Sequence, residues 1–254
     1  MFHRRADSTY LPQGWRDVLA RRFDHWSQLA ADEQDLLGEY AGHLFRSKYW
    51  EAANGFELTD EMRLLIAAQA ALLILGLSLE HYREVGAVIV HPSTVVLHGE
   101  HGSPVDGLMS DAPTPILGEA ADHGPILLAW DAVSEDLQHP WGGHNVVFHE
   151  FAHKIDMLDE IVDGTPPMDR DRLERWTEVC EHHYELAQAG DDEVLDSYAG
   201  VNPAEFFAVA TEAFFDLPLD MAELKPDLYE VFAAFYRQDP AARMERAMGD
   251  PAAD

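Results

Sequence analysis

Residues 143–156 read Gly143-His144-Asn145-Val146-Val147-Phe148-His149-Glu150-Phe151-Ala152-His153-Lys154-Ile155-Asp156, and this stretch decides the fold. It contains the pattern His-Glu-x-x-His, which is typical of zinc hydrolases. If the stretch is helical, His149 and His153 project from one face about one turn apart, close enough to share a metal ion. Zinc binds neutral imidazole nitrogens, and a catalytic zinc site keeps one position open for water. Glu150 is placed to take a proton from that water.

The helical phase of the stretch is an independent test. At about 100° per residue, the polar residues fall on one side of the helix and the bulky apolar residues on the other. The polar side holds Asn145, His149, Glu150, His153 and Asp156, and the apolar side holds Val147, Phe148, Phe151, Ile155 and Leu158. A buried metal site requires such an amphipathic helix, and a surface helix with two solvated histidines is the disfavoured alternative. Asp156 or Asn145 could orient a metal-binding histidine, and a place on the helix surface is an equal alternative for Asn145.

A third protein ligand has to come from another part of the chain, because two imidazoles rarely hold a catalytic zinc ion alone. The best candidate stretch runs from Asn202 to Phe215, where Asn202 can cap a helix that Pro203 begins. This helix is apolar almost all round and should be buried. Its Glu205 and Glu212 lie seven residues apart on one stripe. Glu205 could instead complete a capping box, and Glu212 could form a salt bridge, so the residues alone leave the choice open.

The rest of the chain predicts a mostly helical protein with a small sheet. Helices are expected at residues 13–29 (one or two short ones), 32–45, 60–77 and 169–188, and strands at 86–90, 94–97 and 125–130. Residues 97–123 are rich in Gly, Pro, Asp and His and predict an irregular loop. The strand at 125–130, if it forms an exposed edge, could pair with an extended peptide. The pairs His182/His183 and His98/His101 are interpreted as ordinary residues, although the second is a weak candidate for another metal site.

The composition excludes several classes of function. The 254 residues carry a formal net charge of −30 and only three lysines, which argues against direct binding to nucleic acid or to an anionic membrane. The longest apolar stretch, residues 64–79, is too short and too interrupted to span a membrane. The only cysteine, Cys180, excludes an internal disulfide framework and suggests a reducing compartment. Because the sequence also turns polar before any apolar run appears, we expect a cytoplasmic protein.

Several motifs together resemble one family, the Mlc titration factor A (MtfA) family of zinc-dependent peptidases, which is itself distantly similar to the catalytic domain of anthrax lethal factor. The resemblance rests on segments that cover most of the chain. They are Gly55-Phe56-Glu57-Leu58, Gly124-Pro125-Ile126-Leu127-Leu128, His149 to Asp156, Asp196-Ser197-Tyr198-Ala199 and Asn202-Pro203-Ala204-Glu205-Phe206-Phe207.

The resemblance implies an α+β, zincin-like metallopeptidase fold, mostly helical with a small mixed sheet beside the His-Glu-x-x-His helix. It implies a single peptidase domain over residues 1–254, with a helical part at 1–80 and the sheet, the zinc helix and the C-terminal helices at 81–254. It also implies that Glu205 is the third zinc ligand, that Tyr198 stands over the metal, and that Glu212 is a supporting or packing residue. Some relatives have an extra histidine that caps the metal, but the matching segment here, Gly107-Leu108-Met109-Ser110, has none.

We therefore expect a zinc-dependent peptidase in which His149, His153 and Glu205 hold Zn²⁺, Glu150 is the general base and Tyr198 donates a hydrogen bond to the oxyanion. The substrate would be a peptide, and the activity could be that of an aminopeptidase. The resemblance further implies binding to a transcriptional repressor of sugar uptake. The alternative function is a non-catalytic protein that sequesters a regulator and whose zinc site is structural.

Overall fold

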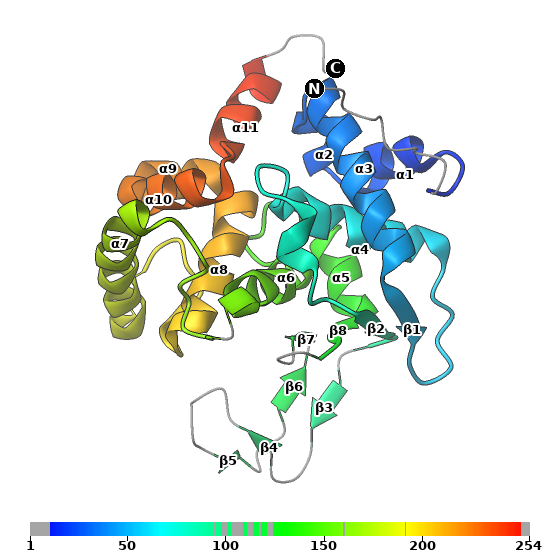
Figure 1. Cartoon of the computed structure of the whole chain (residues 1–254), viewed down its shortest axis with the longest axis horizontal. Helices are drawn as coiled ribbons and strands as arrows, with labels where there is room; N and C mark the ends of the chain where they lie inside the picture. Colours follow the sequence, from blue (N-terminus) through cyan, green and yellow to red (C-terminus); the bar gives the residue numbers. More distant parts are fainter. Residues whose placement is uncertain are drawn as a thin grey trace.

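The computed structural model describes residues 11–93, 124–159, 161–190 and 192–249, and between 94 and 123 only the backbone of short strands. Helices make up most of the described chain (Figure 1). They are α1 (Trp15–Arg22), α2 (His25–Gln28), α3 (Ala31–Ser47), α4 (Asp60–Leu73), α5 (Trp130–Asp136), α6 (Val146–Asp156), α7 (Arg170–Ala189), α8 (Pro203–Asp216), α9 (Pro218–Leu224), α10 (Pro226–Tyr236) and α11 (Pro240–Gly249), with short 3₁₀ turns η2 (Leu79–Tyr82), η3 (Met157–Asp159) and η4 (Ser197–Gly200).

The central sheet has four strands in the order β1 (Tyr49–Ala52), β2 (Ala87–His91), β8 (Ile126–Ala129) and β7 (Gly118–Ala120). The first three are parallel, with Val88 opposite both Trp50 and Ile126, and β7 runs antiparallel to β8. Helix α6 contacts β7 and β8. Two separate antiparallel pairs, β3 (Val95–Leu97) with β6 (Thr114–Ile116) and β4 (His101–Gly102) with β5 (Met109–Ser110), lie below this sheet in Figure 1. The expected α+β architecture is confirmed.

Five local predictions were wrong. The irregular loop expected at residues 97–123 contains strands β4, β5, β6 and β7, and β7 belongs to the central sheet. Residues 49–52 form strand β1 inside the part that was expected to be helical, and residues 130–136 form helix α5, where the sequence predicted no helix. Helix α4 ends at Leu73 rather than near residue 77. The strand predicted at 125–130 lies inside the sheet, between β2 and β7, so it is not an exposed edge that could pair with a peptide. Strand β1 is four residues long and acquires its pairing from a strand far along the chain, so no local pattern marks it.

Two buried helices enclose α6. In α4, every residue from Leu64 to Leu73 is buried, and the only polar one among them is Gln69. Helix α8 is buried from Phe206 to Asp216. Helix α6 contacts both, so packing against two buried helices fixes its position. Because a close-packed interior resists displacement, this arrangement holds the side chains of α6 in place.

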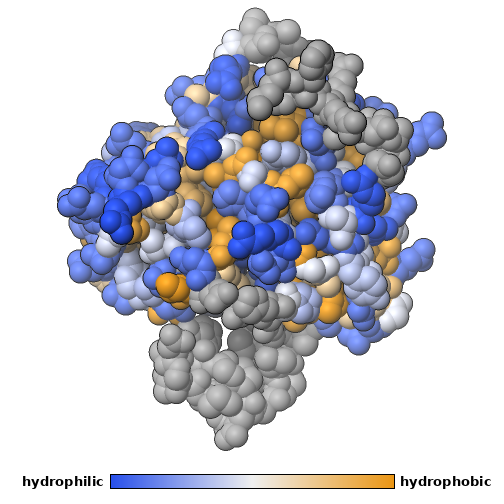
Figure 2. All heavy atoms as spheres, in the orientation of Figure 1, coloured by the Kyte–Doolittle hydropathy of each residue, from blue (hydrophilic) through white to orange (hydrophobic). Residues whose placement is uncertain are grey.

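The surface of the described residues is polar. On the face seen in Figure 2, hydrophilic side chains dominate the side formed by α7, α9 and α10. Apolar side chains are visible near the centre of this face. This agrees with the formal net charge of −30. Within the described part of the chain, no helix has the length and apolarity needed to cross a membrane.

Candidate metal centre

The start of helix α6 is held by three side-chain oxygens. Asn145 caps the helix, because its Oδ1 accepts a hydrogen bond from the Phe148 amide at 3.0 Å. The Asn145 amide donates to Glu212 Oε2 at 2.5 Å, and the Val146 amide donates to Asp136 Oδ2 at 2.8 Å. Asn145 is buried, so it does not lie on the surface, and its side chain bonds to Phe148 and Gln69 rather than to either histidine. The helix that presents the two histidines therefore begins at a fixed point.

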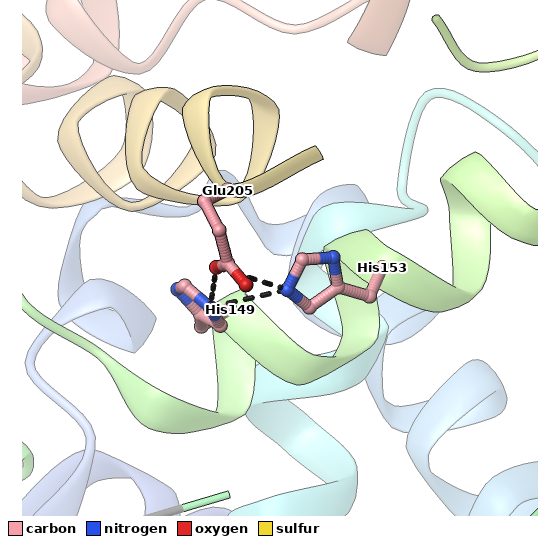
Figure 3. Close-up of side chains that lie close together, drawn as sticks. All are labelled: His149, His153 and Glu205. Atoms are coloured by element: carbon pink, nitrogen blue, oxygen red, sulfur yellow. Dashed lines mark hydrogen bonds and ion pairs between the residues drawn. The ribbon is translucent and has the colours of Figure 1, made fainter. Parts of the chain in front are cut away.

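Helices α6 and α8 bring His149, His153 and Glu205 together. In Figure 3, Glu205 extends from α8 toward the two imidazoles, which project from successive turns of α6. The Nε2 atom of His149 lies 3.0 Å from Glu205 Oε2 and 3.2 Å from His153 Nε2, and His153 Nε2 lies 3.4 Å from Glu205 Oε2. Among the described residues, these three form the one group of at least three His, Cys, Asp or Glu side chains that could hold a metal ion.

The spacing of these atoms fits a metal ion. Zinc bonds of about 2.0–2.2 Å in a tetrahedral site place neighbouring ligand atoms about 3.3–3.6 Å apart. Of the three distances in the cluster, 3.4 Å falls in this range, and 3.0 and 3.2 Å are slightly shorter. Helix position explains the convergence, because residues four apart on α6 share a face, and Glu205 lies in the first turn of α8 opposite that face. The site is of the two-histidine, one-carboxylate type that is common in zinc hydrolases.

Glu212 sets the protonation of His149. His149 Nδ1 lies 2.7 Å from Glu212 Oε1, and because an ionised carboxylate only accepts hydrogen bonds, Nδ1 must donate its proton. In the neutral imidazole, the Nε2 lone pair then faces Glu205 and His153. A metal cation bound between these three electron-rich atoms would satisfy all of them together. Without one, burial opposes the protonated form of His149, but Glu212 and Glu205 raise the pKa of the imidazole well above 6.5.

The charge of Glu205 is stabilised by the same cluster. Burial opposes its ionised form, but hydrogen bonding to His149 and His153 lowers the pKa of the Glu205 carboxyl to about 2. The Glu205 amide donates to Asn202 Oδ1 at 2.9 Å, which is one half of a capping box. The Glu205 carboxylate lies in the cluster with His149 and His153.

The two residues expected to be catalytic border the cluster. Glu150 is buried on α6 beside His149. Tyr198 lies in η4, and its ring centroid is 6.1 Å from that of His149. Burial, together with the carboxylates of Glu205 and Glu150, raises the pKa of the Tyr198 hydroxyl, so this hydroxyl keeps its proton at neutral pH. A protonated hydroxyl next to the cluster can donate a hydrogen bond to a developing negative charge.

Asp156, which the sequence suggested as a residue that orients a metal-binding histidine, bonds to a loop instead. Its Oδ2 accepts a hydrogen bond from the Gly164 amide at 2.9 Å, and within the described part of the chain it makes no hydrogen bond to either imidazole. Gly164 has a φ of 74° and lies against the Pro203 carbonyl, where any side chain would collide with the backbone. Asp156 therefore fastens the loop after α6 to the start of α8.

Sequence reasoning missed three residues that support the site. Asp136 holds the start of α6, and Gln69 Oε1 accepts a hydrogen bond from Asn145 Nδ2 at 3.0 Å. His144 Nδ1 lies 3.0 Å from Glu212 Oε2, and hydrogen bonding to Glu212 raises the pKa of His144 to about 9. Only Gln69 could have been found from the sequence, because an amide in an otherwise apolar helix needs a buried polar partner.

The other histidines singled out from the sequence do not join the cluster. His183 is buried on α7, and its Nε2 lies 3.0 Å from Asp227 Oδ1, which agrees with the structural interpretation of the pair at 182 and 183. His98, the side chain of His101 and the side chains of the segment at 107–110 lie outside the described residues. Cys180 is buried, and burial raises the pKa of its thiol, so it behaves as a small apolar residue.

Two imidazoles and a carboxylate, with a second carboxylate and a tyrosine beside them, define the donor set of a metallopeptidase. Comparison with known proteins agrees. The chain matches the family described as Glucose-regulated metallo-peptidase M90 over residues 2–237, and it belongs to that family.

Curated relatives cover nearly the whole chain. It is 32% identical to the Mlc titration factor A of Serratia proteamaculans over 258 residues, which span 97% of this chain and 97% of that protein. The Mlc titration factor A of Edwardsiella ictaluri is 32% identical over 223 residues, 85% of this chain and 84% of that protein. An uncharacterized protein of Synechocystis is 34% identical over 236 residues, 91% of this chain and 86% of that protein. The resemblance read from the sequence motifs is confirmed.

Proposed function

We propose that this protein is a zinc-dependent peptidase with a zincin-like fold, and that His149, His153 and Glu205 hold the metal ion. The observation that carries the proposal is the convergence of the three ligand atoms within 3.4 Å, with the lone pair of His149 aimed at the other two by Glu212. When bound, a zinc ion supplies a Lewis acid and lowers the pKa of coordinated water toward about 7.

The protein's own side chains then carry the proton transfers. The Glu150 carboxylate accepts a proton from the attacking water and delivers it to the nitrogen of the leaving amine. The Tyr198 hydroxyl donates a hydrogen bond to the oxyanion that forms from the substrate carbonyl. Both residues lie beside the cluster, and a purely structural metal site would need neither.

The substrate in this proposal is a peptide, and aminopeptidase-like cleavage is the specific form to test. The single cysteine, which favours a reducing compartment, supports the cytoplasm as the location of this activity. The name Mlc titration factor A, borne by relatives at 32% identity, favours a second function for this chain. In that function, the protein binds and sequesters a transcriptional repressor of sugar uptake, and the metal site is structural.

A digest of a peptide library by the purified protein separates the two functions. We expect cleavage that a chelator abolishes and that added zinc restores, and we expect none from the Glu150→Gln variant with its metal still bound. A protein that binds one equivalent of zinc but cleaves no peptide would contradict the peptidase and favour the sequestering function. The positions of cleavage show whether removal of the N-terminal residue dominates.

A further inference from the structure

A buried ion pair lies on the side of the molecule where α10 packs against α7 and α9 (Figure 1). Lys225, between α9 and α10, places its Nζ 2.6 Å from Asp192 Oδ2, and the two side chains are 8% and 4% exposed. A buried ion pair adds little net stability compared with apolar side chains of similar volume, because both charges lose their hydration. This pair is therefore better explained by the segment that it holds in place.

A histidine contacts the ammonium group of Lys225 as well. His183 Nε2 on α7 lies 3.0 Å from Asp227 Oδ1 in the first turn of α10, and His183 Nδ1 lies 3.5 Å from Lys225 Nζ. Burial opposes the charge of Asp227, but hydrogen bonding to His183 lowers the pKa of its carboxyl, which therefore accepts the proton of Nε2. Burial lowers the pKa of His183, so its neutral ring presents a lone pair at Nδ1 to Lys225. The ammonium group is thus held between α7 and Asp192.

Asp192 begins the segment that leads to Tyr198. Its Oδ1 accepts hydrogen bonds from the Val194 amide at 2.9 Å and from the Leu195 amide at 2.8 Å. Asp196 Oδ1 then accepts from the Tyr198 amide at 2.8 Å, at the start of η4. Two successive turns, each closed by an aspartate, therefore connect Asp192 to the backbone of Tyr198, and the ion pair ties the first turn to the helices.

Apolar packing holds this segment only in part. Of residues 192–199, Leu195 and Ala199 are buried, and the others are partly or fully exposed. Segments with few buried apolar contacts open locally at a low cost in free energy. The polar anchor at Asp192 therefore restrains a segment that apolar packing leaves loosely held.

We propose that Asp192 and Lys225 are positioning residues that hold the Tyr198 side chain beside the metal cluster. Tyr198 is 39% exposed, so the place of its ring, 6.1 Å from that of His149 between centroids, depends strongly on the backbone that carries it. The proposal rests on the proposed function, in which the Tyr198 hydroxyl donates a hydrogen bond to the oxyanion. A displacement of about 1 Å in such a group can lower a rate about 10²-fold.

Peptide turnover by the zinc-loaded full chain tests the effect on catalysis. Asp192→Asn leaves an acceptor for the Val194 and Leu195 amides but removes the charge that pairs with Lys225. We expect kcat to fall about 10- to 100-fold with KM within about twofold, because the oxyanion forms only in the transition state. Glu193→Gln, which removes an exposed carboxylate next to Asp192, is the matched control and should leave kcat unchanged. Unchanged kcat in folded Asp192→Asn would overturn the proposal.

A double variant separates the positioning of Tyr198 from general damage to the enzyme. In the Tyr198→Phe background the hydroxyl is absent, so Asp192→Asn should lower kcat by less than about twofold further. A merely structural role would lower kcat by the same factor in both backgrounds, and that result would overturn the proposal. If Asp192→Asn does not fold, Asp192→Asn/Lys225→Met takes its place with the same expected results, because this pair of changes leaves no unpaired charge in the interior.

Hydrogen exchange of the metal-free protein gives a readout that does not need activity. In Asp192→Asn, the amides of residues 194–200 should exchange about 10-fold faster or more, while those of α6 keep their wild-type rates. Unchanged exchange at residues 194–200, or an equal rise in α6, would overturn the proposal even in an active enzyme. Faster exchange at residues 194–200 together with no peptide turnover by the wild type would instead reject the peptidase function and support the anchoring of Tyr198 by Asp192.

Discussion

Replacing Glu212 by glutamine should weaken zinc binding without removing a ligand of the metal. In the native protein, Oε1 of Glu212 accepts from His149 Nδ1 and Oε2 accepts from the Asn145 amide. Glutamine has one acceptor oxygen, so it cannot accept both. The Asn145 amide is a fixed donor, which leaves the glutamine NH₂ group facing His149 Nδ1. The neutral imidazole can accept a hydrogen bond from this NH₂ group at Nδ1 only if its proton moves to Nε2. Nε2 is the atom that should bind the metal, so the proton then competes with the metal.

The expected loss has two parts. Removing the carboxylate that orients a metal-binding histidine typically lowers metal affinity about 10- to 100-fold, which corresponds to about 1.4–2.7 kcal/mol. Glu212 is 1% exposed, and the buried hydrogen bonds that it accepts from the Asn145 amide and His144 lose their charged acceptor, which costs about 1–3 kcal/mol of folding stability. We therefore expect Glu212→Gln to bind zinc more weakly and to unfold at a lower denaturant concentration.

Chelator competition on the metal-free protein, together with denaturant unfolding, measures both quantities. Glu223→Gln, an exposed glutamate on α9, is the matched control and should leave both unchanged. Glu205→Gln should lose the metal altogether, since it removes a ligand. A folded Glu212→Gln protein with zinc affinity within about twofold of the wild type would refute the orienting role. Loss of zinc in Glu212→Gln combined with retention in Glu205→Gln would exchange the roles of the two glutamates.

Three further outcomes follow from the structure. Glu150→Gln should lower peptide turnover by about 10²–10⁴ with zinc still bound, so near-normal turnover measured beside metal analysis would reject Glu150 as the base. Tyr198→Phe should lower kcat by about 10²–10³ at unchanged metal content, whereas the exposed Tyr49→Phe should leave kcat unchanged; equal rates in the two variants would remove Tyr198 from the mechanism. Burial lowers the pKa of His25 to about 4, so the unfolded chain, with a histidine pKa near 6.5, takes up this proton first as the pH falls. Between pH 7 and pH 5, proton uptake by this group in the unfolded chain should lower the free energy of unfolding by about 2 kcal/mol. Denaturant unfolding should therefore show that the free energy of unfolding of His25→Gln falls by about 2 kcal/mol less than that of the wild type over this range. An equal fall in both proteins would show that His25 titrates normally when folded.

The sequence was most informative where one pattern imposed both a local structure and a chemistry. The spacing of His149 and His153 predicts a helix and a shared metal together, and the structure brings their Nε2 atoms to 3.2 Å. Asn202 and Pro203 marked the start of α8 for equally local reasons, a side-chain cap and a fixed φ. Such signals need no knowledge of the rest of the fold.

The remainder depended on long-range contacts that no local pattern encodes. Glu205 and Glu212 lie on one stripe of α8 and are equivalent in periodicity, yet they meet opposite sides of the His149 ring, Glu205 at Nε2 and Glu212 at Nδ1. Which glutamate meets which nitrogen is set by the crossing of α6 and α8, a tertiary property. Family resemblance supplied that choice. Strand β1 escaped prediction for the same reason, because its partner β2 begins at Ala87.

One carboxylate links the folding of the helix to the preparation of the metal site. Glu212 accepts from the first amide of the α6 cap and from His149 Nδ1, so the group that holds the start of the helix also aims the first histidine. Burial opposes the charge of Glu212, but interaction with His149 and hydrogen bonding to His144 lower the pKa of its carboxyl, so Glu212 stays ionised. An ionised Glu212 in turn holds a proton on Nδ1, so that Nε2 is the nitrogen that faces Glu205 and His153. The same hydrogen bonds that form the start of the helix therefore also fix the orientation of the first histidine.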